Sequence, residues 1–320
     1  MVKKDTRLTL ILPNLSPVLT QKINTPILPN YFKKIMAHAV FSAEKSGLSR
    51  VFLNYFSETA HVGRDLPLAA LTSKTNALHA DPCYLHADRD QILLFSDDLT
   101  LTNEESLALI SEIQPLFDEV GGKLRLTESG QWLLDLNRLA TVSFTALDDV
   151  KGKSVQGHLP KGDDLEQKKW IRLWNEVQMQ LYISPINQQR TNAGKAPINS
   201  VWFWGAGTLT LQQKAWTQVQ GHSTLLQQLA NKTNTPMNAS INNEEKYDVN
   251  ALTSGEYLCL LNEFDLEQDW LATLNDVDNK ILKPLWKQCK MLRINTLTLH
   301  IPEHGTYRLT GLDCWKFWKL

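Results

Sequence analysis

Residues 175–207 read NEVQMQLYISPINQQRTNAGKAPINSVWFWGAG, and their pattern is the clearest indication of the fold in this chain of 320 residues. The four residues Val201–Trp204 are apolar on both faces of an extended chain, which is typical of a central strand in a parallel sheet. Gly205–Gly207 follows at the carboxyl end of that strand, where open α/β sheets bind their ligands. The pattern therefore predicts an α/β protein with a ligand-binding loop after a central strand.

The same residues concentrate arginine, amide and acidic side chains. A guanidinium beside several amides can bind a phosphate or a carboxylate, because arginine offers a bidentate fork and the amides orient the anion. The candidate ligand-binding residues are Asn175, Glu176, Gln178, Asn187, Arg190, Asn199, Gly205 and Gly207. On spacing alone, caps for a helix and anchors for a loop explain these side chains equally well.

A second polar cluster occupies Asp81–Asp90 and includes Asp81, His86, Asp88 and Arg89. A general acid and a general base could be drawn from these side chains, and we include them among the candidate ligand-binding residues. The alternation of polar groups before an apolar strand also suits a structured entry loop.

Apolar periodicity predicts alternating strands and helices along the rest of the chain. A strand at Arg7–Leu12, a helix within Tyr31–Lys45 and a strand at Val51–Asn54 form a β-α-β start. Further expected elements are the strands Ile92–Phe95, Lys123–Thr127, Gln131–Leu136, Tyr257–Leu261 and Thr296–Ile301, the helices Asn103–Phe117, Asp164–Tyr182 and Leu211–Asn231, and a long helix from Trp270 to Ile281. Thr102 and Glu105 have the spacing of a capping box. The tryptophans at helical spacing or within apolar strands are expected in the core.

Composition excludes several classes of protein. The hydrophobic content of 42% and the charged content of 21% are those of a folded globular chain. A formal net charge of −1 argues against nucleic-acid binding, and no apolar run reaches the roughly 18 residues that a transmembrane helix needs. The four cysteines are far apart in sequence, which argues against a zinc site and favours free thiols in the cytoplasm.

The end of the sequence, Cys314–Lys319, is short, basic and aromatic. Such a segment could dock onto a partner or a membrane surface, or it could pack against the body of the protein.

A family resemblance rests on residues in the middle of the chain. They are Asp81–Asp90, Asn175-Glu176, Ser184-Pro185-x-Asn187-x-x-Arg190, Gly194, Pro197-x-Asn199-Ser200 and Trp202-x-Trp204-Gly205-x-Gly207. They resemble the corresponding runs in archaeal-type cofactor-independent phosphoglycerate mutases and, more closely, in bacterial RpfE-type regulatory proteins. The resemblance implies the alkaline-phosphatase-superfamily fold, an α/β sheet between helices with a smaller α+β domain inserted. The expected boundaries are 1–78 with 185–320 for the sheet domain and 79–184 for the insert.

The resemblance also implies a chemistry from which this chain departs. The mutases hold a phosphoryl-accepting serine between two divalent metals bound by Asp and His. Their first ligand lies in an Asp-Gly pair after the first strand, where this chain has Pro13-Asn14. In place of the later Asp-x-x-x-His and Asp-His ligands, Asp265, His300 and His304 remain as candidates for a single ion, manganese or zinc.

Three functions are consistent with these observations. The first is a mutase-like regulatory or ligand-binding protein without a cofactor, which binds a small phosphorylated or carboxylated molecule or a protein partner. The second is an active metal-dependent phosphoglycerate mutase-like isomerase or phosphomonoesterase with a rearranged metal site. The third is an interaction protein with a purely structural role.

Overall fold

The computed structural model describes residues 5–20, 28–73, 76–97, 99–238, 252–261 and 270–316. The chain divides into two compact units: unit 1 combines residues 1–58 with residues 211–320, and unit 2 is the intervening segment 59–210. These boundaries differ from the expected ones at 78/79 and 184/185. The reason is that the strand Ser200–Trp204 pairs with the strand Asn76–Asp88 and therefore belongs to unit 2.

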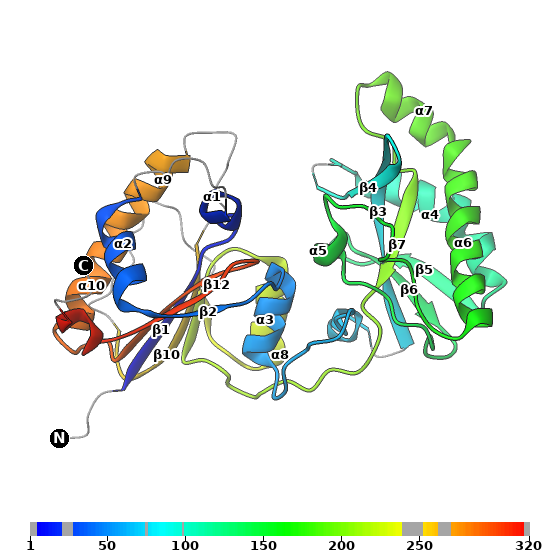
Figure 1. Ribbon diagram of the computed structural model, residues 1–320. Coiled ribbons are helices and arrows are strands. Elements are labelled where there is room, and N and C mark those ends of the chain that lie inside the picture. Colours follow the sequence, from blue (N-terminus) through cyan, green and yellow to red (C-terminus); the bar gives the residue numbers. More distant parts are fainter. Residues whose placement is uncertain are drawn as a thin grey trace. The chain divides into compact units, whose positions relative to one another are not determined.

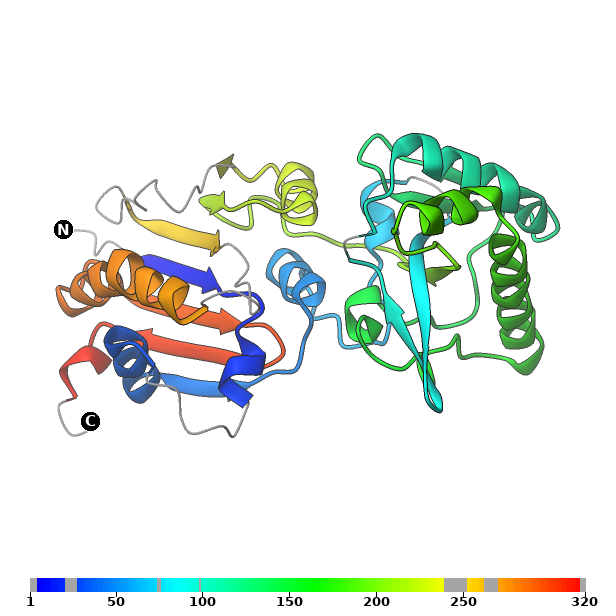
Figure 2. The ribbon, with the colours of Figure 1, turned by 90° about the horizontal axis from the view of Figure 1, so that it is seen from above.

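Among the described residues, seven strands form the sheet of unit 1, in the order β2-β12-β11-β1-β10-β8-β9. They are β1 (Thr6–Ile11), β2 (Val40–Ala43), β8 (Gln218–Gln220), β9 (Met237–Asn238), β10 (Gly255–Leu260), β11 (Thr296–Ile301) and β12 (Gly305–Thr310). β1 runs parallel to β10 on one side and to β11 on the other. β12 is antiparallel to both β11 and β2. Figure 2 shows β1, in blue, between strands from the far end of the chain.

Helices cover both faces of this sheet (Figure 1). They are α1 (Ser16–Thr20), α2 (Asn30–His38), α3 (Leu48–Phe56), α8 (Thr224–Lys232), α9 (Trp270–Val277) and α10 (Lys283–Lys290), and a π-helical turn at Asp278–Leu282 joins the last two. On the face covered by α2, α9 and α10, Leu8 and Leu10 of β1 share one buried cluster with Phe32 and Leu285. The predicted long helix after Trp270 is confirmed.

Unit 2 is a layer of helices on an antiparallel sheet. Its strands are β3 (Asn76–Asp88), β4 (Gln91–Phe95), β5 (Gly122–Leu126), β6 (Trp132–Leu136) and β7 (Ser200–Trp204), and its helices are α4 (Asn103–Asp118), α5 (Leu147–Val150), α6 (Asp164–Tyr182) and α7 (Pro185–Asn192). The apolar stripe of α6 packs on β7, where Trp174 meets Trp202 with ring centroids 6.3 Å apart and Trp170 meets Phe203 at 5.4 Å. All three tryptophans are buried, so the prediction that they belong to the core is confirmed.

The prediction that Val201–Trp204 is a central parallel strand is wrong. β7 pairs antiparallel with β3, with Trp204 opposite His79 and Val201 opposite Pro82. A strand that is apolar on both faces indicates burial on both faces, and it does not fix the direction of its neighbour. Most of the expected loop Asp81–Asp90 is likewise strand, because β3 extends to Asp88.

Three other elements differ from the sequence-based prediction. Val51–Asn54 is not a strand but part of helix α3, whose one apolar side buries Phe52 and Phe56. The helix expected within 31–45 ends at His38 and is followed by strand β2. The helix expected from Leu211 begins only at Thr224, after strand β8 and the N-cap Ser223. Short apolar runs of four residues suit both a strand and a buried helix turn, which explains the first error.

The predicted capping box at the start of α4 is confirmed. The Thr102 hydroxyl accepts the N–H of Glu105 at 3.1 Å, and the Glu105 carboxylate accepts the N–H of Thr102 at 2.9 Å. Two backbone donors that the helix itself cannot satisfy are thereby paired.

We expect Thr102→Ala to lower the free energy of unfolding by about 1 kcal/mol, because it removes one of these cap bonds. Urea denaturation of the purified chain measures this change. Thr141→Ala, at an exposed position outside the helices and strands, is the matched control and should stay within about 0.5 kcal/mol of the parent. Equal stabilities of the two variants would contradict the role given to the cap.

Candidate functional site

Arg190, the centre of the predicted anion site, is one of the most buried side chains in unit 2, at 1% exposure. Its Nε donates to the carbonyl of Ala196 at 3.0 Å, one Nη donates to the Glu105 carboxylate at 3.0 Å, and the other donates to the carbonyl of Leu99. Burial acts to raise the pKa of Glu105, but the Thr102 N–H, the Arg190 guanidinium and Lys195 together outweigh it, so the pKa of Glu105 lies below its ordinary value. The guanidinium thus donates hydrogen bonds to three segments of the chain, and both of its Nη groups are bonded to the protein itself.

The two asparagines near Arg190 also bond to the backbone. Asn187 donates to the carbonyls of Leu181 and Ile198 and accepts the N–H of Ile198, each at 2.8 Å. Asn199 pairs with both the N–H and the carbonyl of Leu85, at 2.7 and 2.9 Å. Both side chains therefore act as backbone anchors in this structure.

The loop after β7 holds an anion supplied by the chain itself. The Asp65 carboxylate accepts the N–H of Gly205 at 2.8 Å and the N–H of Ala206 at 3.0 Å. Gly205 has a φ of 93°, and a Cβ there would lie 2.8 Å from the His79 ring and 3.3 Å from the backbone N of Ala69. Gly207, with a φ of 123°, continues the same turn. Glycine is needed for this geometry because other residues rarely adopt such angles.

The remaining candidates on helix α6 face outward. Glu176 pairs with Arg172 one turn earlier, at 2.7 Å, and Gln178 donates to the carbonyl of Trp174 at 3.1 Å. Asn175 is exposed. These three residues do not converge with Arg190 on a common cavity.

The second polar cluster is split along strand β3. His86, Asp88 and Arg89 lie at the β3–β4 hairpin, where Arg89 takes the left-handed turn conformation with a φ of 53°. Asp81 lies opposite Trp202 in the β3–β7 pair and accepts the indole N–H of Trp204 at 2.6 Å. The structure therefore does not bring Asp81 together with the other three.

Around Asp81 lies a buried polar group that the sequence did not single out. His79, at 3% exposure, stacks on Trp204 with ring centroids 4.8 Å apart, and its Nδ1 makes no hydrogen bond to any residue of the described ranges. Burial lowers the pKa of His79 and raises the pKa of Asp81, and each of the two moderates the shift of the other. Both side chains are held in an environment that disfavours their charged forms.

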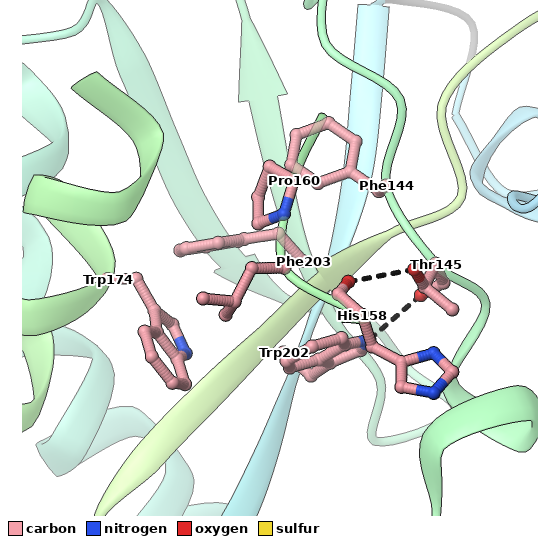
Figure 3. Close-up of a pocket in the computed structure, with 8 residues that line it drawn as sticks. Phe144, Thr145, His158, Pro160, Trp174, Trp202 and Phe203 are labelled. Atoms are coloured by element: carbon pink, nitrogen blue, oxygen red, sulfur yellow. Dashed lines mark hydrogen bonds between the residues drawn. The ribbon is translucent and has the colours of Figure 1, made fainter. Parts of the chain in front are cut away.

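The cavity in unit 2 shown in Figure 3 lies between α6, β7 and the segment 144–160. Its volume is about 10 Å³, which is on the order of one water molecule. Thr145 closes one side by donating from its hydroxyl to the carbonyl of His158 and by accepting the indole N–H of Trp202, both at 2.8 Å. This cavity is too small for a phosphorylated metabolite.

In unit 1, polar side chains gather where the parallel strands β1 and β11 end. His300 of β11 lies opposite Ile11 of β1, and its carbonyl accepts the N–H of Leu12 at 2.9 Å. Its ring Nδ1 is 2.8 Å from the hydroxyl of Tyr55, on helix α3, and its Nε2 is 3.7 Å from the Glu44 carboxylate, just after β2. Strand ends of this kind bind ligands in open α/β sheets, so we take Glu44, Tyr55 and His300 as the candidate site.

Burial sets the protonation of this site. It lowers the pKa of His300 to about 4, against a smaller opposing effect of Glu44, and it raises the pKa of Tyr55 with a further contribution from Glu44. At neutral pH the imidazole and the phenol are therefore both uncharged, and Glu44 is the acidic group beside them. The Nε2 of His300 makes no hydrogen bond within the described residues.

The other two predicted metal ligands do not complete this site. His304 lies after β11 and its Nε2 is 2.8 Å from the hydroxyl of Tyr307, with the ring stacked beside that of Tyr307. Asp265 lies outside the described residues. Two bridging metal ions require about four to six oxygen or nitrogen ligands. Within the part of the chain that the structure describes, no three His, Cys, Asp or Glu side chains lie close enough to hold one ion. The described residues thus do not fit a two-metal centre.

The sequence patterns did not indicate four of the polar residues described above, namely Asp65, Glu44, Tyr55 and His79. Tyr55 was hidden because its segment was predicted as a strand, whereas on helix α3 it points toward His300. Asp65 and Glu44 have no local pattern, since their partners lie 140 and 256 residues away.

Comparisons with known proteins give local matches in sequence and a long one in structure. A probable 2,3-bisphosphoglycerate-independent phosphoglycerate mutase of Geobacter sulfurreducens is 42% identical over 59 residues, which are 18% of this chain and 14% of that protein. A 2,3-bisphosphoglycerate-independent phosphoglycerate mutase of Methanothrix thermoacetophila is 27% identical over 107 residues, which are 33% of this chain and 26% of that protein. The matches thus span only about a quarter or less of these relatives. No protein-family model matches the chain.

Among solved structures, the PH0037 protein of Pyrococcus horikoshii aligns over 97% of this chain and 88% of its own, with a TM-score of 0.50 and 13% sequence identity. This likeness shows the fold alone, and it confirms the predicted α/β architecture with a sheet flanked by helices. The sequence matches show a local similarity of this chain to 2,3-bisphosphoglycerate-independent phosphoglycerate mutases. No described helix is long and apolar enough to cross a membrane.

We expect Arg190→Met to lower the free energy of unfolding by about 3–5 kcal/mol, because it leaves buried carbonyls and the Glu105 carboxylate without their donor. Chemical denaturation measures the loss. Arg172→Met is the matched control: its partner Glu176 is an i,i+4 neighbour and the Arg172 side chain is 77% exposed, so solvent screens the pair and the free energy of unfolding should stay close to that of the parent. A stable Arg190→Met protein that had lost only the binding of an anion would show that Arg190 serves a ligand instead.

The lowered pKa of His300 predicts a pH dependence of stability. The unfolded chain takes up a proton near the ordinary pKa of 6.5, whereas the folded chain does so only near 4, so stability is lost as the pH falls between these values. The loss of free energy of unfolding expected from His300 over this pH range is about 3 kcal/mol. Denaturation curves at several pH values should show that the free energy of unfolding falls less steeply with decreasing pH for His300→Gln than for the parent. His86→Gln, on the exposed hairpin, should leave the slope unchanged, and equal slopes for all three proteins would refute the assignment.

Proposed function

We propose that this chain is a phosphoglycerate mutase-like protein without the two-metal phosphoryl-transfer site, acting in the cytoplasm as a regulatory or ligand-binding protein. The observation that carries the proposal is the residue set at the carboxyl end of β1. The Asp-Gly pair implied by the resemblance is replaced there by Pro13-Asn14, and Asn14 takes a left-handed turn with a φ of 58°. A neutral amide cannot neutralise a divalent ion as a carboxylate does.

Glu44, Tyr55 and His300 give this strand end a different chemistry. One carboxylate, one phenol and one neutral imidazole can donate and accept hydrogen bonds, yet they supply a single negative charge. Such a set suits recognition of a polar molecule better than the holding of two cations around a phosphate. We propose that the bound molecule is a small phosphorylated or carboxylated compound, or a segment of a partner protein.

The hydrogen bonds of Arg190, Asn187 and the Gly205 loop do not support the anion pocket expected around them. All three already bond to groups of the chain, as described above. We therefore place the proposed ligand at the strand ends of unit 1 and assign the segment 175–207 a structural role. The RpfE-type regulatory proteins remain the group that the resemblance favours, and this assignment is part of the proposal.

A second candidate function is an active metal-dependent isomerase or phosphomonoesterase with a rearranged site. The specific observation in its favour is the buried Nε2 of His300, which has no hydrogen-bond partner in the described part of the chain and lies 3.7 Å from the Glu44 carboxylate. An imidazole and a carboxylate in this arrangement could share one manganese or zinc ion. Asp265 is the other candidate ligand for it.

A mutase assay separates these two functions. We expect no conversion of 3-phosphoglycerate to 2-phosphoglycerate by the purified chain supplied with manganese or zinc, measured by coupling the product to enolase. His300→Gln is the control variant. Metal-dependent conversion by the parent that is lost in His300→Gln would contradict the proposal and establish the second function.

Metal content gives an independent measurement. Elemental analysis of protein purified without chelator should show less than one equivalent of manganese, zinc or iron, and Glu44→Gln should not change the value. A stoichiometric ion that Glu44→Gln removes would place a metal at the candidate site.

A further inference from the structure

One surface of unit 1 combines basic and apolar side chains at the opposite end of the parallel strands from His300. It consists of the outer side of helix α10, the turn that follows it and the 3-10 turn Asp313–Trp315. Between Asp278 and Glu303 the sequence contains five lysines and arginines and no acidic residue, in a protein whose formal net charge is −1. Local positive charge is therefore concentrated here.

The lysines of this surface form one stripe. Lys280, Lys283, Lys287 and Lys290 follow one another at intervals of three and four residues, so they lie on one side of the helix. The opposite side carries Leu285 and Cys289, which are fully buried in the core of unit 1. Lys280, in the π-helical turn before α10, pairs with Asp276 of α9 at 2.5 Å.

Exposed apolar side chains lie at the end of the stripe. Met291 and Leu292 are 53% and 54% exposed, Leu312 is 71% exposed, and Trp315 is 47% exposed. The Lys290 ammonium sits 4.6 Å from the centre of the Trp315 ring, and the indole N–H of Trp315 donates to the carbonyl of Lys290 at 3.2 Å. The tryptophan is thereby fixed next to the last lysine of the stripe instead of being folded into the core.

We propose that this surface binds the anionic face of a lipid membrane. Lysines near such a surface gain electrostatic attraction, while leucine, methionine and tryptophan side chains gain by entering the boundary between head groups and acyl chains. The helix is not inserted, because its apolar side is already buried in unit 1.

Two features favour lipid over other polyanions. The backbone of a nucleic acid would attract the lysines, but it offers nothing to bury Leu312 and Met291. The apolar residues sit on a helix end and a turn, and the cavity of Figure 3 lies elsewhere, in unit 2. Protruding side chains of this kind suit a soft interface better than the pocket-bearing surface of an acidic protein. The proposal stands independently of the function proposed for the His300 site.

The test is flotation of the full chain with lipid vesicles. We expect binding to vesicles of phosphatidylcholine mixed with phosphatidylserine, no binding to phosphatidylcholine alone, and a loss of binding at high salt, since screening shortens the reach of surface charges. The double variant Lys287→Glu/Lys290→Glu should bind at least about tenfold more weakly. The matched control is Lys168→Glu/Lys169→Glu on α6, which makes the same change of charge in unit 2 and should bind like the parent.

A second pair of variants tests the apolar part. Leu312→Gln should weaken binding several-fold, whereas Leu165→Gln, at an exposed position of α6, should not. Both positions are exposed, so thermal unfolding should be unchanged and loss of binding cannot be attributed to misfolding. Failure to float with phosphatidylserine vesicles, or equal binding by the lysine and control variants, would overturn the proposal. Retention on duplex DNA or polyglutamate with the same dependence on Lys287 and Lys290, without vesicle binding, would overturn it in favour of another polyanion.

Discussion

The position of strand β1 between β10 and β11 is the constraint on which the rest of the molecule depends. Thr6 lies opposite Gly255 and Arg7 opposite Thr296, so the first strand finds both neighbours in the last quarter of the chain. Parallel strands need crossover connections, and here one of these connections contains a complete second unit. The sheet can form only around an insertion, and the carboxyl end of its parallel strands is assembled from segments that are remote in sequence.

This arrangement explains why the candidate site is made from three elements. β11 supplies His300, α3 supplies Tyr55, and the residue after β2 supplies Glu44. Their burial keeps the imidazole and the phenol neutral, which leaves hydrogen bonding as their main capacity. By contrast, Arg190 and Asp65 of unit 2 make hydrogen bonds that stabilise that unit. Arg190 links α7 to the cap of α4, and Asp65 links the segment before β3 to the end of β7.

Local patterns predicted the local features of this structure. The capping box at Thr102, the buried strand β1, the apolar stripe of α6 and the long helix after Trp270 depend on residues within one or two helical turns, and all four are confirmed. The direction of β7 and the helical state of Val51–Asn54 were predicted wrongly, because apolar content reports burial and not the identity of the neighbour. The role of Arg190 could not be predicted, since its partners Glu105 and Leu99 lie 85 and 91 residues away. Glu44 and Tyr55 became candidates only when the fold placed them beside His300.

The contact of Asp65 with the loop after β7 has a consequence for competition between anions. A carboxylate held by the fold against two N–H groups acts as a tethered ligand, and tethering over short distances corresponds to effective concentrations in the millimolar range or above. A free phosphate at a lower concentration would have to compete with the Asp65 carboxylate, which the fold holds next to these N–H groups. A glycine-rich turn at the end of a strand can thus carry all the features of an anion-binding loop while its binding capacity is saturated by its own chain.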